Sequence, residues 1–180
     1  MGCGLDGEFY RVIRTSVKKV TLDKSAYSPG RAVLYNKDMR TLYHLWLSPH
    51  SRKVRIVLGE KKLEFDLQAE KVWERREGFL RLNPAGQVPV LVETDGTAIS
   101  GGQVISEYLD EMHAIPPLLG RGSLERAEVR RLCAWFDDKF NAEITENLVG
   151  EKVMTRFLGL GSPDSAAVRA GKAKLHNHSN

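Results

Sequence analysis

Apolar and polar residues alternate with regular periods from residue 40 onward, and these periods predict a succession of strands and helices. Apolar runs bounded by turn residues predict four strands, at 41–46, 63–67, 88–92 and, after a hairpin turn at Asp95-Gly96, 97–100. Apolar residues at helical spacing predict helices that begin near residues 51, 73 and 101. The resulting order is βαβ followed by αββα, which an all-antiparallel sandwich cannot have. We therefore expect an α/β domain.

The pattern becomes purely helical after Pro116-Pro117. Apolar residues recur at steps of three and four, which predicts a long amphipathic helix over 124–147. A second helix is predicted over 166–176, and we expect the helical segment as a whole to be unfinished. The long helix carries an apolar stripe without obvious partners, and we expect this stripe to be partly exposed or buried in a dimer. Its members are Leu132, Phe136 and Phe140.

Residues 1–38 follow neither period and are expected to form a weakly ordered extension, with the functional chain beginning at Met39. They carry seven basic and four acidic side chains, whereas residues 39–180 carry 20 basic and 19 acidic ones. The net charge of +4 belongs mostly to the extension, and a mixed-sign surface argues against nucleic-acid binding. No apolar run reaches the roughly 18 residues of a membrane span. The expected location is cytoplasmic, without a membrane partner.

Two motifs at a fixed separation resemble those of the glutathione S-transferase family. The first is Ser48-Pro49-His50-Ser51-Arg52-Lys53-Val54-Arg55, after the first strand. The second is Asn83-Pro84-Ala85-Gly86-Gln87-Val88-Pro89-Val90-Leu91, before the hairpin. The resemblance implies a thioredoxin-like βαβαββα domain over 39–117, followed by a truncated all-α C-terminal domain over 123–180. It also implies glutathione as co-substrate, a small electrophile as second substrate, and a homodimer.

The resemblance implies that Ser48 is the catalytic residue, as in the serine-type, tau-like classes of the family. The thiol of glutathione has a pKa of about 8.5, so little of it is nucleophilic thiolate at neutral pH. A hydroxyl donor at a helix N-terminus favours the thiolate by hydrogen bonding and through the helix dipole. The alternative is that Ser48 only caps the helix. Ser51 has the better spacing for that cap, which favours catalysis for Ser48.

Val88-Pro89 is the second expected contact with glutathione. In the family this peptide bond is cis, which turns the main chain of Val88 outward to pair with the cysteinyl backbone of the tripeptide. The alternative is a rigid proline at the entry of a strand. Gln87 directly precedes this pair and is assigned to the same glutathione site.

Arg75, thirteen residues before Val88, is the expected partner of the glycine carboxylate of glutathione. Several classes of the family carry a basic residue there, and a guanidinium binds a carboxylate through paired N–H donors. Arg76 is the adjacent alternative. The other interpretation is that both arginines are simply solvated on the second helix.

The chain departs from the family at Gly101-Gly102, where the family carries an acid-Ser pair that holds the γ-glutamyl end. The main-chain N–H groups at this helix start can still receive a carboxylate, so both glycines stay in the expected glutathione site. Gln103 is expected to compensate in part through its amide. A charge-assisted hydrogen bond contributes roughly 1.5–3 kcal/mol. Its loss would weaken binding by about tenfold to a hundredfold.

The cysteines and histidines add little chemistry. Cys3 and Cys133 make neither a disulfide framework nor a zinc site, and Cys133 is expected to be an inert buried thiol. His50 is expected at the surface. His176 and His178 lack a third ligand nearby, so we expect no metal site and interpret them as an incidental helix end.

The favoured hypothesis is a detoxifying glutathione transferase-like enzyme in which Ser48 stabilises the thiolate and Val88 orients the tripeptide. The alternative is a catalytically weak or inactive binding or scaffold protein of the same fold, which Gly101-Gly102 and the short C-terminus favour. A family relative that acts on small organic acids, such as an isomerase or dehalogenase, also stays open.

Overall fold

The computed structural model describes residues 39–179. The extension predicted for residues 1–38 lies outside the described residues. The chain divides into two compact units, which meet in sequence at His113 and Ala114. The N-terminal unit contains a sheet with helices, and the C-terminal unit is entirely helical in its described part.

The N-terminal unit is built on a mixed four-stranded sheet with the strand order β2-β1-β3-β4. The strands are β1 (Arg40–His44), β2 (Phe65–Ala69), β3 (Val90–Val92) and β4 (Ala98–Ser100). β1 runs parallel to β2 and antiparallel to β3, and β3 pairs antiparallel with β4. Leu42 in the centre faces Leu67 on one side and Leu91 on the other. The mixed sheet confirms the predicted α/β class and its thioredoxin-like order.

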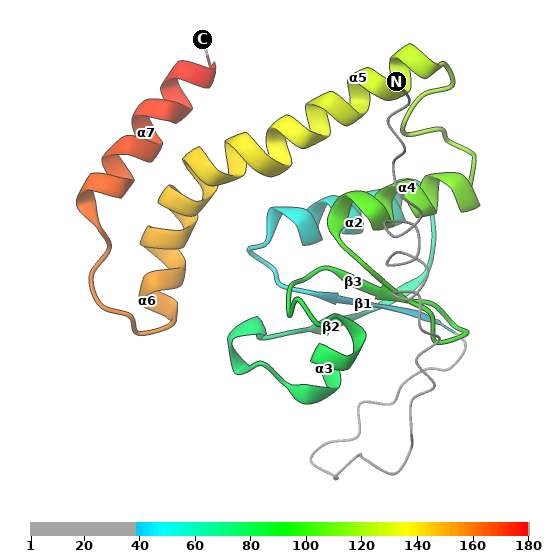
Figure 1. Ribbon diagram of the computed structural model, residues 1–180, viewed down its shortest axis with the longest axis horizontal. Coiled ribbons are helices and arrows are strands. Elements are labelled where there is room, and N and C mark those ends of the chain that lie inside the picture. The colour runs from blue at the N-terminus through cyan, green and yellow to red at the C-terminus, as the bar shows by residue number, and fades with distance from the viewer. Residues whose placement is uncertain (1–38, 180) are drawn as a thin grey trace, which may run out of the picture. The chain divides into compact units, whose positions relative to one another are not determined.

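Helices cover both faces of this sheet. Figure 1 shows α2 (Pro49–Glu60) and α4 (Gly102–Met112) side by side over one face and α3 (Glu77–Leu82) on the other. Successive strand residues point to opposite faces, so β3 contributes to two cores. Val90 and Val92 pack with Phe79 of α3 in one of them. The fully buried side chains elsewhere in the unit include those of Leu42, Val54, Leu58, Leu91, Ile105 and Leu109.

The single helix predicted from residue 73 to 82 is wrong. A 3₁₀ turn, η2 (Val72–Glu74), ends at Arg75 with a φ of 45°, and α3 begins only at Glu77. The left-handed conformation at Arg75 breaks the helical path, and it is uncommon for a residue with a Cβ atom. The side chain of Glu70 is fully buried and accepts from Arg76 Nε at 3.1 Å. Arg76 is therefore not a freely solvated arginine.

One long helical path dominates the C-terminal unit. It consists of α5 (Ser123–Ala134), the π-helical segment η3 (Trp135–Met154) and α6 (Thr155–Phe157). The predicted helix therefore exists but continues ten residues beyond its expected end at 147. The Thr155 N–H bonds to the Gly150 carbonyl oxygen, five residues earlier, as in a π-helix. The second predicted helix is present as α7 (Ser165–Ser179).

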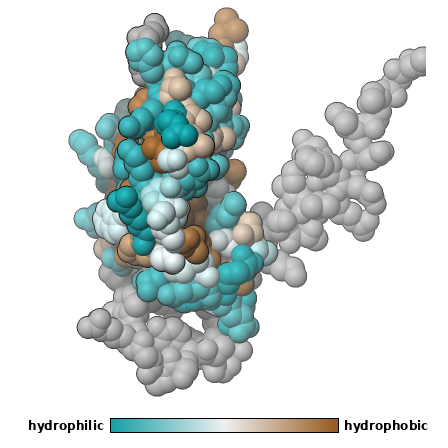
Figure 2. Space-filling model, turned by 90° about the vertical axis from the view of Figure 1, so that its left-hand side faces the viewer, coloured by the Kyte–Doolittle hydropathy of each residue, from teal (hydrophilic) through white to brown (hydrophobic). Residues whose placement is uncertain are grey.

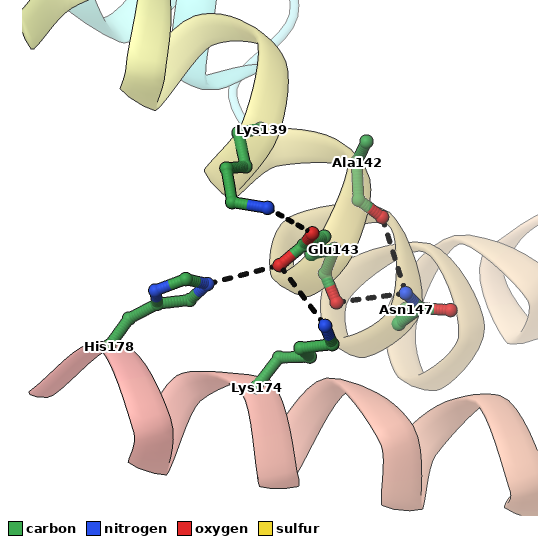
Figure 3. A network of polar contacts seen from close by, with 6 residues as sticks. All are labelled: Lys139, Ala142, Glu143, Asn147, Lys174 and His178. Atoms are coloured by element: carbon green, nitrogen blue, oxygen red, sulfur yellow. Dashed lines mark hydrogen bonds and ion pairs between the residues drawn. The ribbon is translucent and has the colours of Figure 1, made fainter.

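Helix α7 packs against η3 through a close backbone approach and a polar network. A Cβ atom at Gly171 would lie 2.9 Å from Asn147 Cβ, so only glycine allows this approach. Glu143 accepts from His178 Nε2 at 3.0 Å and from Lys139 Nζ at 2.6 Å (Figure 3). These bonds lower the pKa of Glu143 to about 2, His178 contributing most. The interpretation of His178 as an incidental helix end is therefore wrong.

The apolar stripe of the long helix is partly exposed, as predicted. Leu132 is 42% exposed and Phe136 is 54% exposed, whereas Phe140 is half-buried with its ring 5.5 Å from that of Phe136. The face drawn in Figure 2 is mainly hydrophilic, and its apolar residues lie in small separate spots.

Cys133 is half-buried, not fully buried as expected. None of the described helices has the length and hydrophobicity needed to cross a lipid bilayer.

Candidate functional site

The residues expected to bind glutathione gather where α2 begins, where β3 is entered and where α4 begins. Gly101 N donates to the Pro89 carbonyl oxygen at 3.1 Å, which joins the α4 start to the proline. A Cβ atom at Gly102 would lie 3.2 Å from both Cβ and the carbonyl oxygen of His50. This contact joins the same helix start to the first turn of α2. His50 is half-buried there.

Ser48 is the N-cap of α2, which corrects the expectation that Ser51 has this task. The Ser48 Oγ accepts from Ser51 N at 3.2 Å, and Pro49 occupies the first helical position, where a missing N–H costs nothing. Ser51 is fully buried, and its own Oγ accepts from Leu45 N at 3.4 Å. Capping uses the oxygen of Ser48 as an acceptor only. Its hydroxyl hydrogen has no acceptor among the described residues, so capping and donation to a thiolate are compatible.

The peptide bond between Val88 and Pro89 is cis, as the family resemblance implies. Pro89 is buried and Val88 half-buried, and the ladder of β3 begins only at Val90. The main chain of Val88 therefore precedes the sheet pairing. Gln87 is exposed, and its carbonyl oxygen accepts from Asn83 Nδ2 at 2.8 Å, which holds the loop in place.

The structure brings Arg75 to this loop and gives Arg76 another task. A Cβ atom at Gly86, whose φ is 68°, would lie 3.2 Å from a terminal nitrogen of Arg75. The Arg75 guanidinium thus lies beside the loop that carries Gln87 and Val88, and the residue is exposed. Arg76 is paired with the buried Glu70. Of the two alternatives, Arg75 is the one whose guanidinium lies beside this loop.

The start of α4 offers main-chain groups but few side-chain ligands. Gly101 has a φ of 95°, and a Cβ atom there would meet only the Val104 side chain, at 3.7 Å or more. The amide of Gln103 is already engaged, because its Oε1 accepts from Lys53 Nζ at 3.0 Å and its Nε2 donates to Glu107 at 2.8 Å. In this arrangement Gln103 ties α2 to α4.

A second cluster, on the residues after β1, was missed by the sequence analysis. Trp46 is 60% exposed, and the Arg55 guanidinium lies 4.5 Å from the centre of its ring. An Arg55 terminal nitrogen lies 3.4 Å from Nδ1 of His44, which is buried. Burial, followed by the charge of Arg55, lowers the pKa of His44, so at neutral pH this nitrogen accepts. The sequence feature that could have indicated this cluster is Trp46 in the turn before α2, followed by Arg52 and Arg55 three residues apart on the helix.

The described residues contain no group of three or more His, Cys, Asp or Glu side chains that could hold a metal ion. The polar groups of the site are hydroxyl, guanidinium and main-chain groups. These suit an organic anion or a peptide backbone as ligand.

Comparison with protein families and known proteins places these features in context. Residues 47–112 match the family model described as "Glutathione S-transferase, N-terminal domain". FtsZ-localized protein A of Caulobacter vibrioides is 46% identical over 142 residues, which are 77% of this chain and 62% of that relative.

Solved structures similar to this chain also include glutathione S-transferases. A crystal structure of a glutathione S-transferase from Rhodospirillum rubrum is 54% identical, with a TM-score of 0.76, over 78% of this chain and 63% of that one. A glutathione S-transferase from Methylobacillus flagellatus with glutathione bound is 28% identical, with a TM-score of 0.58, over 77% of this chain and 65% of that one. The chain thus spans less than two thirds of the length of these proteins.

Proposed function

Since the chain belongs to the glutathione S-transferase family by its N-terminal domain, we propose that it is a protein-binding member of this family. Its glutathione site is weakened, and its partner is FtsZ. The proposal starts from the localisation to FtsZ that is stated in the name of FtsZ-localized protein A, a relative with 46% identity.

The start of α4 carries this proposal. Gly101 and Gly102 provide neither an acid for the α-amino group of glutathione nor a hydroxyl for its carboxylate. A side chain at Gly102 would meet the main chain of His50 at 3.2 Å, so the close packing of α2 and α4 favours the glycine. Each missing charge-assisted hydrogen bond corresponds to about tenfold or more in affinity. Because the packing favours glycine at the start of α4, where glutathione would need side-chain ligands, we infer that the fold serves a ligand other than glutathione.

Two binding measurements on the full chain test the proposal. Purified FtsZ of Caulobacter vibrioides is immobilised, and the chain is passed over it in biolayer interferometry. Glutathione is titrated into the chain in a calorimeter. We expect saturable binding to FtsZ and glutathione binding at least about tenfold weaker than that of a family member with an acid-Ser pair. Absence of FtsZ binding, or glutathione binding as tight as in that member, would overturn the proposal.

A second candidate function is the thiol activation expected from the family. Two observations favour it: Ser48 stands at the N-terminus of α2 with its hydroxyl hydrogen available, and the Val88–Pro89 bond is cis. In this function Ser48 donates to the sulfur of glutathione, Val88 pairs with the cysteinyl backbone, and Arg75 receives the glycine carboxylate. A small electrophile is then attacked by the thiolate. Here too, a cytoplasmic homodimer is what the family leads us to expect.

Conjugation of glutathione to 1-chloro-2,4-dinitrobenzene tests this second function. Ser48→Gly is the informative variant, because a glycine N-cap costs only a few tenths of a kcal/mol relative to serine. We expect the rate to fall by about tenfold or more if the hydroxyl stabilises the thiolate. Equal rates for the two proteins, or no turnover by the unchanged chain, would exclude Ser48 as a catalytic residue.

A further inference from the structure

The surface formed by Trp46, Arg52 and Arg55, here called the Trp46 patch, combines exposed apolar area with uncompensated positive charge. Trp46 is 60% exposed, and the neighbouring Leu47 is 40% exposed. The Arg55 guanidinium lies 4.5 Å from the centre of the Trp46 ring, and one of its terminal nitrogens contacts Nδ1 of the buried His44. The indole and the guanidinium therefore form one pre-arranged unit.

Arg52 adds a second positive charge to this unit. It stands one helical turn before Arg55 on α2, is exposed, and is near enough that its charge lowers the pKa of Arg55, after burial. Within the described part of the chain, no carboxylate lies within ion-pair distance of Arg52 or Arg55. Arg76 and Arg81 differ in this respect, since Arg76 pairs with Glu70 and Arg81 with Glu77. Two like charges side by side are unfavourable unless an anion joins them.

We propose that the Trp46 patch binds an acidic peptide segment of a partner protein, an inference that rests on the proposed protein-binding function. The carboxylates of the segment pair with Arg52 and Arg55 through charge-assisted hydrogen bonds, and an apolar residue of the segment covers the indole of Trp46. Arginine and tryptophan are among the residues that dominate binding energy at protein interfaces.

The positive charge of the Trp46 patch favours an acidic segment over a second copy of the chain or a nucleic acid. A second copy of the chain docked with this patch at the two-fold axis would bring the same arginines together, which is repulsive. A nucleic acid would require a longer basic track, but residues 39–180 are nearly balanced with 20 basic and 19 acidic side chains. A short acidic segment needs only the two guanidinium groups present and gains from the exposed indole.

Fluorescence anisotropy with the full chain tests the inference. The probe is a fluorescein-labelled synthetic peptide, Glu-Asp-Glu-Phe-Asp-Glu-Leu-Glu. The controls are the same peptide with Gln and Asn in place of the acids, and a labelled twelve-nucleotide oligothymidylate. We expect the acidic peptide to bind about tenfold tighter than the neutral one, with an affinity that falls as salt is added. Equal binding of both peptides, or tighter binding of the oligonucleotide, would overturn the inference.

Matched variants locate the binding on the patch. Arg52→Ala and Trp46→Ala should each weaken peptide binding by about tenfold, because each removes one charge-assisted or apolar contact. Arg81→Ala removes another exposed arginine of the same unit and should leave the affinity unchanged. The inference is wrong if neither patch variant differs from the Arg81→Ala control while circular dichroism shows all three folded.

Binding to FtsZ by the same preparations separates this inference from the proposed function. If the chain binds FtsZ but not the acidic peptide, the patch inference is wrong and the proposed function stands. If it binds the peptide through the patch but not FtsZ, the patch inference stands and FtsZ is the wrong partner.

Discussion

Lys61 Nζ lies 2.5 Å from Asp110 Oδ1, and both side chains are almost completely buried, at 0% and 4% exposure. The same ammonium group donates to the His113 carbonyl oxygen at 2.5 Å. Lys61 caps the C-terminal end of α2, and Asp110 lies near the end of α4. The pair therefore joins the ends of the two helices whose starts form the candidate site.

Lys61→Met should destabilise the N-terminal unit by about 3–5 kcal/mol, because it leaves the Asp110 carboxylate buried without a counter-charge. The double variant Lys61→Met/Asp110→Leu should recover most of this loss, since a buried ion pair is often replaceable by apolar residues. Urea denaturation followed by circular dichroism measures both. Lys71→Met, at an exposed lysine paired with Glu74, is the control and should change stability by less than about 0.5 kcal/mol. A loss no larger than in this control would show that the buried pair contributes little.

The sequence predicted the element order because its periods are long and its turns carry clear residues such as Asp95-Gly96. It could not predict the break at Arg75, because a left-handed arginine has no sequence signature. The pattern also misassigned the N-cap of α2. Spacing alone favoured Ser51, whereas the burial of Ser51 under the β1–α2 turn leaves the cap to Ser48.

Among the site residues, those within a motif were easier to place than those set by tertiary contacts. The cis bond at Pro89, inside the second motif, agrees with the family resemblance. Gln103 forms hydrogen bonds with Lys53 and Glu107 and so links α2 to α4. These contacts could not be predicted from the order of residues in the sequence.

The free energy of unfolding should decrease as the pH is lowered, and His44 should contribute to this decrease. The pKa of His44 is lowered in the folded state by burial and by the charge of Arg55. A lowered pKa means that the unfolded chain takes up the proton first, so this contribution is fully present above pH 6.5 and is lost as pH falls through the folded pKa. His44→Asn keeps an acceptor for Arg55 but cannot be protonated. Thermal melts from pH 8 to pH 5 should show a shallower decline for the variant than for the unchanged chain. Parallel curves would show that His44 does not contribute to the decline.

Glu143 should hold α7 against η3 down to strongly acidic pH. Its pKa of about 2 lies below the ordinary value of 4.5 because His178 and Lys139 bond to its carboxylate. The contribution is therefore complete above pH 4.5 and is lost as pH falls toward 2. Glu143→Gln removes the charge at every pH, and we expect the amides of α7 to exchange several-fold faster in hydrogen–deuterium exchange at neutral pH. Glu128→Gln, whose partner Arg131 lies on the same helix, is the control and should leave α7 unaffected.

The double variant Gly101→Glu/Gly102→Ser tests whether the helix start alone limits glutathione binding. It supplies the acid and the hydroxyl that the family uses, so we expect glutathione affinity measured by calorimetry to rise by at least about tenfold. The gain should come with a loss of stability of about 1–3 kcal/mol, since residue 101 has a φ of 95° and a side chain at 102 meets His50 at 3.2 Å.

Gly78→Ser is the matched control, because a Cβ atom there has no neighbour within 4 Å. It should change neither affinity nor stability by a measurable amount. FtsZ binding by the double variant should equal that of the unchanged chain if the partner docks at the Trp46 patch, which does not include the glycines. A folded double variant that gains no affinity for glutathione would place the defect elsewhere in the site, at Ser48, Val88 or Arg75, and would remove the main support for a site weakened at α4.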